Sequence, residues 1–160
     1  MFSKRACALT VATEGWATDK AQARFENILA TYYADAPLHA VLASNDSTAL
    51  GVANALASSY TGNYPVLTGQ DCDIASVKNM IAGTQSMSVF KDTRTLAAKV
   101  VEMVDAIMKG NEPPINDTET YDNGTGVIPS FLCEPVSATV DDIQTLLIDS
   151  GYYTEADLAG

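Results

Sequence analysis

Polar side chains stand directly after three short apolar runs in the middle of the sequence. Asn45 follows "HAVLAS", Gln70 and Asp71 follow "PVLTG", and Lys91 follows "SMSVF". Amides donate and accept hydrogen bonds, carboxylates accept them, and an ammonium group donates. In an open parallel sheet the carboxyl ends of the strands meet at one edge, which is where ligands bind. We therefore expect these groups to converge on a ligand rich in hydroxyl groups, because a hydroxyl both donates and accepts.

Trp16 and Asp73 extend this set at neighbouring strand ends. A flat indole can cover the apolar C–H face of a pyranose, and charged partners shorten hydrogen bonds to hydroxyls. A phosphate ligand would instead call for a glycine-rich loop, and neither G-x-x-x-x-G-K nor G-x-G-x-x-G occurs in the chain. The residues thus favour a sugar. The strand-end candidates are Thr13, Glu14, Trp16, Asn45, Asp46, Gln70, Asp71, Asp73, Lys91, Asp92 and Arg94.

Each candidate also has a purely structural interpretation. Asp46, Asp73 and Asp92 stand where helix N-caps belong. We expect Asp46 to cap its helix while Asn45 faces the ligand. A single tryptophan can equally belong to a core or an interface, and Lys91 can pair with a nearby aspartate.

The central sequence repeats a strand followed by a helix. The expected strands, rich in Val and Leu as strands buried on both faces are, are "CALTVA", "HAVLAS", "PVLTG" and "SMSVF". Apolar residues at helical spacing predict an amphipathic helix after each one, with Gly83 and Gly110 as C-terminal caps. Ala21, Phe25, Ile28 and Leu29 make the first apolar stripe. Alternation of this kind predicts an α/β fold, with a mostly parallel sheet between two helical layers.

The character of the sequence changes after Gly110. Residues 111–138 are rich in turn residues and contain Pro129 and Pro135, which restricts any strand there to an edge or a crossing segment. Residues 139–160 are expected to form a short helical tail capped by Thr139 or Asp141. We interpret residues 1–160 as one α/β lobe.

Composition excludes several classes of protein. The formal net charge is −11, from 20 acidic and 9 basic residues, which argues against nucleic acid as a partner. The 3 cysteines are widely spaced and the 1 histidine, His39, has no neighbouring ligand in sequence, so no metal site is expected. The two bases before the short apolar run at the start resemble an export signal only weakly, and we interpret that run as a strand.

The strand-end motifs resemble those of a known family. "AVLASND", "TGQDCD", "SMSVFKDTRTLA" and "VIPSFLCEPV" are similar to the C-terminal half of bacterial periplasmic monosaccharide-binding proteins, of the xylose and multiple-sugar type, over nearly the whole chain. The resemblance implies the type I periplasmic-binding-protein fold and a sugar held without covalent chemistry between two lobes. It implies that Asn45, Asp71 and Lys91 bind sugar hydroxyls and that Trp16 stacks on the ring. Gln70 and Asp73 are the supporting residues that it implies. Cys72 stands where relatives have a small residue such as Ala, which bears on the ligand preference.

The family also implies partners. Its members have about twice this length, so we expect this chain to be the C-terminal lobe, either a part of a longer protein or a shortened gene product. Expected partners are a monosaccharide, the membrane permease of an ATP-driven importer, and the missing N-terminal lobe. The location implied is periplasmic or extracytoplasmic. A lone lobe exposes its cleft and hinge face, and a homodimer through that face is expected.

Two other classes compete with a transport receptor. The effector domain of a sugar-responsive repressor shares the lobe fold, but such repressors have an aromatic and paired acids at the position of "TGQDCD" and an N-terminal helix-turn-helix. These 160 residues show neither, although a truncated chain could have lost the helix-turn-helix. A small α/β enzyme could use a strand-end lysine. No nucleophile–base pair or cofactor fingerprint stands out, so we expect no enzymatic activity and no cofactor.

Overall fold

The computed structural model describes residues 9–159, which form two compact units. The first unit comprises residues up to Ser88 together with Ala138 onward, and the second comprises Val89–Ser137. The chain passes from one unit to the other at two strands, β3 (Met87–Phe90) and β4 (Val136–Ala138). Most of the expected hinge segment at 111–138 lies in the second unit, which ends at Ser137, and its boundaries stay a prediction.

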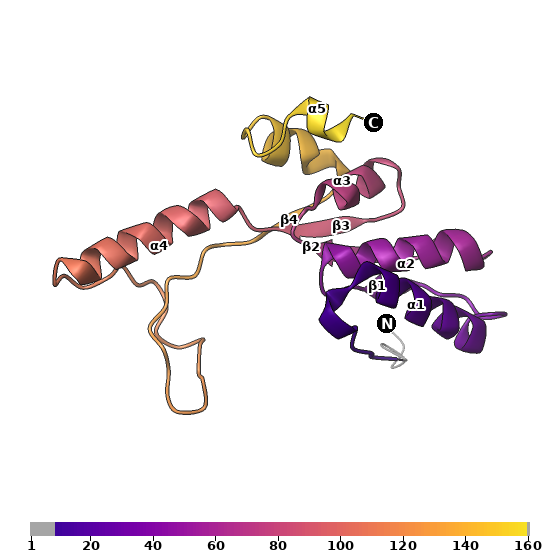
Figure 1. The fold of residues 1–160 in the computed structure, drawn as a ribbon, viewed down its shortest axis with the longest axis horizontal. Coiled ribbons are helices and arrows are strands. Elements are labelled where there is room, and N and C mark those ends of the chain that lie inside the picture. Colours follow the sequence, from indigo (N-terminus) through magenta and orange to yellow (C-terminus); the bar gives the residue numbers. More distant parts are fainter. Residues whose placement is uncertain (1–8, 160) are drawn as a thin grey trace, which may run out of the picture. The chain divides into compact units, whose positions relative to one another are not determined.

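The first unit is built on a sheet with the strand order β1-β2-β3-β4. β1 (Ala40–Leu42) and β2 (Val66–Gln70) are parallel, with Ala40 opposite Val66. Figure 1 shows α1 (Thr18–Tyr32) and α2 (Asp46–Ser59) on one side of the strands, and α3 (Ile74–Ile81) on the other. The predicted α/β class is confirmed.

The core of the first unit lies where α1 and α2 pack against each other and against β2. The predicted stripe of α1 is buried, from Ala21 at 4 % exposure to Leu29 at 2 %. It meets Leu56 of α2 and Leu67 of β2, which are 2 % and 0 % exposed. Burial of one face explains why helical periodicity located these helices correctly.

Two expectations for strands are wrong. The described part of "CALTVA", residues 9–12, is not a strand, and the first element is instead the short 3-10 helix η1 (Glu14–Trp16). β1 ends the strand order, so it has one neighbouring strand, and Leu42 is 79 % exposed rather than buried. An apolar run reports strand propensity but not whether a second strand lies beside it.

The C-terminal segment returns to the first unit. It forms the short turns η2 (Val140–Asp142) and η3 (Gln144–Ile148), then α5 (Glu155–Leu158). The Asp142 carboxylate accepts hydrogen bonds from the Thr139 N–H and hydroxyl at 2.9 and 2.7 Å, so Thr139 begins this segment as expected. Leu147 is fully buried and anchors it.

The second unit holds one long helix and an extended loop. α4 (Thr93–Met108) has no buried residue, although its apolar residues recur at helical spacing. In the loop, Asn116 bonds the backbone of Leu132 through both ends of its amide, at 2.7 and 3.1 Å. Lys99 of α4 lies over the ring of Phe131, 4.2 Å from its centroid, and joins helix to loop. Across residues 9–159, no helix has the length and apolarity needed to cross a membrane.

Candidate functional site

Asn45 is the N-cap of α2. Its side-chain oxygen accepts a hydrogen bond from the Thr48 N–H at 3.1 Å, and the Thr48 hydroxyl accepts in return from the Asn45 N–H at 3.4 Å. The expectation that Asp46 caps this helix is therefore wrong, because the N-cap is Asn45. Asn45 is 8 % exposed, and its amide nitrogen is the group it can still offer a ligand.

Asp46 is a buried acceptor that ties three strand ends together. It is 1 % exposed. Its carboxylate accepts from the Asp73 N–H at 2.9 Å, from Gln85 Nε2 at 3.0 Å and from the Ser88 hydroxyl at 2.9 Å. These partners stand after β2, before β3 and within β3. Such a network fixes the relative positions of the loops that carry the candidate residues.

The loop after β2 is conformationally strained. Among residues 9–159, the non-glycine residues with positive φ are Trp16 at 53°, Asp71 at 108° and Cys72 at 54°. Strain of this kind costs about 1–3 kcal/mol per residue and collects at binding sites. All three lie in the loops that the sequence singles out, and two of them are predicted ligand residues.

Gly69 makes room for the buried carboxylate. A Cβ at this position would stand 2.6 Å from Gln85 Nε2 and would overlap Asp46 Oδ1. The glycine of "TGQD" is therefore needed because the Asp46 and Gln85 side chains approach its Cα closely, and not because the chain turns there.

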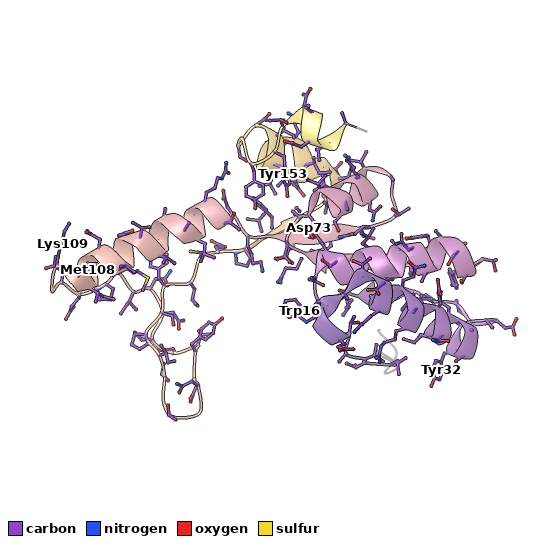
Figure 2. All side chains as sticks on the ribbon, in the orientation of Figure 1. Trp16, Tyr32, Asp73, Met108, Lys109 and Tyr153 are labelled. Atoms are coloured by element: carbon purple, nitrogen blue, oxygen red, sulfur yellow. The ribbon has the colours of Figure 1, made fainter. Side chains whose placement is uncertain are left out.

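Trp16 lies just before α1 and is 65 % exposed. Trp16 is the last residue of η1. Glu14, the first residue of η1, forms an ion pair with Lys20 at 2.6 Å. Just after Trp16, the Thr18 hydroxyl donates to the Ser47 carbonyl at 3.0 Å, which ties this turn to the start of α2. Figure 2 shows Trp16 and Asp73 on the same side of the unit, where α1 and α3 begin. An exposed indole held in this way is available to a ligand.

Lys91 belongs to the second unit. Its side chain is exposed, and the next residue, Asp92, is the N-cap of α4, accepting from the Arg94 N–H at 2.9 Å. The structure thus brings together the loops of Trp16, Asn45 and Asp71 in one unit, while the role of Lys91 in the same site stays a prediction. Gln70 ends β2 half-buried, and Asp73 is exposed ahead of α3.

Burial controls the electrostatics of this region. Loss of solvent raises the pKa of Asp46 above its ordinary value, although the Asp73 N–H opposes the shift. Burial and the nearby Asp46 charge also raise the pKa of Asp73. Burial raises the pKa of the Cys72 thiol to about 11, so Cys72 is a neutral thiol at pH 7 and serves as packing. Across residues 9–159, no group of His, Cys, Asp and Glu is arranged to hold a metal ion.

Sequence reasoning missed Gln85 and Ser88. Both are buried polar residues, at 3 % and 0 % exposure, and both bond Asp46. A signal for Ser88 exists in "SMSVF", where it alternates with Met87 and Val89 and so shares a face with the apolar Phe90, which is the buried face. Nothing in the sequence signals the partner of Gln85.

Comparison with known proteins agrees with this architecture. A family model described as "Periplasmic binding protein domain" matches residues 4–112. The chain belongs to the periplasmic binding protein family. Among curated relatives of this domain, the multiple sugar-binding periplasmic receptor ChvE of Rhizobium radiobacter is 44 % identical over 147 residues, and the multiple sugar-binding periplasmic protein SbpA of Azospirillum brasilense is 44 % identical over 150.

Solved structures of the family are also similar. A solute-binding protein of an ABC transporter from Clostridium phytofermentans, with bound β-D-glucose, superposes with a TM-score of 0.89 at 66 % identity. The match covers 93 % of this chain and 46 % of that one. A carbohydrate-transporter solute-binding protein from Chloroflexus aurantiacus, in complex with D-glucose, gives 0.80 at 37 % identity, covering 88 % and 41 %.

The match is partial in length. The alignment to ChvE covers 89 % of this periplasmic binding protein chain but 42 % of ChvE. The predicted family is confirmed. These relatives are named as receptors and binding proteins, not as enzymes.

Proposed function

We propose that this chain forms one wall of a monosaccharide site in the solute-binding component of an ABC-type sugar importer. The observation that carries the proposal is the strain at Trp16 and Asp71, two predicted ligand residues whose loops are joined through α2 and the Asp46 carboxylate. The glucose bound in two solved relatives supports a hexose as ligand, and a pentose is the other ligand proposed.

Each proposed contact has a distinct chemical role. The Trp16 indole covers the C–H face of the ring, and the Asp71 carboxylate accepts hydrogen bonds from sugar hydroxyls. The Asn45 amide nitrogen donates to a hydroxyl, because its oxygen is used by the helix cap. Lys91 is proposed to donate to another sugar hydroxyl. Gln70 and Asp73 support the loop from either side.

The remaining contacts are proposed to come from an N-terminal lobe. Hydrogen bonds in a half-open site compete with water and contribute about 0.5–1.5 kcal/mol each. Four such contacts cannot offset the cost of association well enough for tight binding. We therefore expect the isolated chain to bind a sugar with a Kd of about 1 mM or weaker.

The importer's membrane permease is the proposed partner of the whole receptor, and the proposed location is the periplasm or another extracytoplasmic space. The effector domain of a repressor is the alternative for this lobe fold. The receptor interpretation is favoured because two curated relatives at 44 % identity carry receptor and periplasmic names.

The single tryptophan provides the test. Trp16 fluorescence is followed while the chain is titrated with D-glucose, D-xylose, D-galactose, L-arabinose and D-ribose. We expect a saturable change with at least one sugar, weakened in Asp71→Ala and Lys91→Ala.

Lys109→Ala is the matched control for the lysine variant, since Lys109 pairs with Asp105 at the far end of α4. A fluorescence signal that no sugar changes, even at molar-range concentrations, would count against binding by this chain. An equal loss in Lys109→Ala would remove Lys91 from the site.

A further inference from the structure

The loop Asp71–Asp73 is held from two sides by groups outside the predicted ligand set. On one side the Asp46 carboxylate accepts the Asp73 N–H at 2.9 Å. On the other side the Tyr153 hydroxyl, from the C-terminal segment, donates to the Cys72 carbonyl at 3.0 Å. The two anchors hold the two ends of one peptide unit, the Cys72 carbonyl and the Asp73 N–H, and Figure 2 shows Tyr153 reaching toward the start of α3 beside Asp73.

Ser88 links the Asp46 carboxylate to a second backbone group of the loop, the Cys72 N–H. Its hydroxyl donates to both oxygens of Asp46 at 2.9 Å and accepts from the Cys72 N–H at 3.1 Å. Ser88 is 0 % exposed, so neither bond competes with water. A buried, charge-assisted chain of this kind is stronger than the same bonds at a surface.

The anchors are needed because the loop they hold is strained. Asp71 and Cys72 have φ values of 108° and 54°, a region that side-chain-bearing residues avoid. Without fixed partners at Cys72 and Asp73, the peptide units would relax toward negative φ and move Asp71. The backbone hydrogen bonds of Cys72 and Asp73 thus determine where the Asp71 carboxylate stands.

We propose that Asp46 and Tyr153 are positioning residues, which together with Ser88 hold the loop Asp71–Asp73 in the conformation that sets the Asp71 carboxylate for its ligand. The inference deepens the proposed function and rests on it for the identity of that ligand. It gives the C-terminal segment a part in binding, since that segment contributes Tyr153.

Two readouts test the loop on the full chain. Amide hydrogen exchange of Cys72 and Asp73, measured by NMR, reports the anchors without any ligand, and the Trp16 titration with D-glucose and D-xylose reports binding. In Ser88→Ala and Tyr153→Phe, we expect exchange of these amides to become about tenfold faster and sugar affinity to fall about threefold to tenfold, as expected for loss of one buried hydrogen bond.

Asp46 itself is tested with a pair of variants. Asp46→Ala removes the acceptor of the Asp73 N–H, whereas Asp46→Asn keeps one oxygen that can accept it. We expect Asp46→Asn to restore most of the protection and affinity lost in Asp46→Ala. If Asp46→Ala does not fold, the Ser88 and Tyr153 variants decide the question alone.

Matched controls separate positioning from stability. Tyr60→Phe removes a tyrosine hydroxyl that accepts from the Leu38 N–H at 2.9 Å, at the opposite end of α2. Leu56→Ala opens the core without touching the loop. Both controls are expected to lower the melting temperature while leaving sugar affinity within about twofold of the parent chain. Effects of substitutions at well-separated sites are independent to about this accuracy.

The outcomes are distinguishable. The inference would be overturned if the exchange rates of the Cys72 and Asp73 amides changed only in proportion to global stability, in the control variants as in the test variants. It would also be overturned if faster exchange of these amides left sugar affinity unchanged. If the unaltered chain binds no sugar, the proposed function fails for this chain. The exchange data then still decide whether Asp46, Ser88 and Tyr153 hold the loop.

Discussion

At the scale of single residues, the buried Asp46 carboxylate makes stability depend on pH. Its pKa in the folded state is raised by burial, so the folded chain binds its proton more tightly than the unfolded chain does. The stabilisation linked to this proton is complete below the unfolded pKa of 3.8 and is lost as pH rises through the folded pKa. Asp73 shifts in the same direction.

We predict that the parent chain becomes more stable relative to Asp46→Asn as pH falls toward 4, because the asparagine does not titrate. Thermal unfolding of both proteins across this range measures the difference. The partly exposed Asp92 behaves in the opposite way. Its pKa is lowered chiefly by the Arg94 side chain, so the stability that it contributes is lost as pH falls through its folded pKa. Asp92→Asn is therefore the control, and a constant difference between the parent and Asp46→Asn would contradict the assignment.

The residue scale also shows where sequence reasoning stops. Asn45 and Asp46 are adjacent acceptors, and either residue type is a good N-cap. Sequence placed both at the strand end but could not tell that the amide caps while the carboxylate crosses to Asp73 and Ser88. That choice is set by partners 27 and 42 residues away, which no local pattern reports.

At the scale of elements, the packing of α1 on α2 depends on one glycine. A Cβ at Gly51 would lie 2.7 Å from the Ala21 Cβ and 2.8 Å from the Gln22 nitrogen, and would also overlap the Thr18 carbonyl. Helix propensity alone would make Gly51→Ala stabilising by about 1 kcal/mol. The backbone of α1 cannot yield as a flexible side chain would, so overpacking reverses the sign.

We predict that Gly51→Ala destabilises the chain by about 1–3 kcal/mol, measured by chemical denaturation. Ala57→Gly on the exposed face of the same helix is the control, where only propensity acts and about 1 kcal/mol is expected. A stabilised Gly51→Ala would mean that α1 moves freely away from α2.

Helices with one buried face were predictable from the sequence. The sequence did not show which neighbouring element packs against a given apolar run. Periodicity located α1, α2, α3 and α4, and Gly83 and Gly110 end their helices with positive φ as expected. The strand expected before Glu14 failed over its described residues 9–12, because alternation and apolarity do not reveal whether a neighbouring strand exists. Periodicity likewise shows that α4 has an apolar face but not what packs on it.

At the scale of the whole molecule, α4 presents apolar side chains to solvent within the second unit. The exposed residues are Leu96 (50 %), Val100 (51 %), Val101 (68 %), Val104 (49 %), Ile107 (60 %) and Met108 (81 %). A helix with a marked apolar face stabilises itself chiefly by burying that face. The chain spans 42 % of the length of ChvE, and we propose that an N-terminal lobe covers α4 in the complete receptor.

Without that lobe, the apolar face of α4 can be buried against the same face of a second copy of the chain. We therefore predict concentration-dependent self-association through α4. The double variant Val100→Lys with Val104→Lys puts charge on the apolar face, and like charges then oppose each other across the contact. We expect sedimentation velocity to show the parent chain forming dimers or larger species as concentration rises and the double variant remaining a monomer. Thr95→Lys with Ala98→Lys adds the same charge to the opposite face and should leave association unchanged. A parent chain that stays monomeric at high concentration would show that the face is covered within its own chain, and equal effects of both double variants would assign the association to net charge.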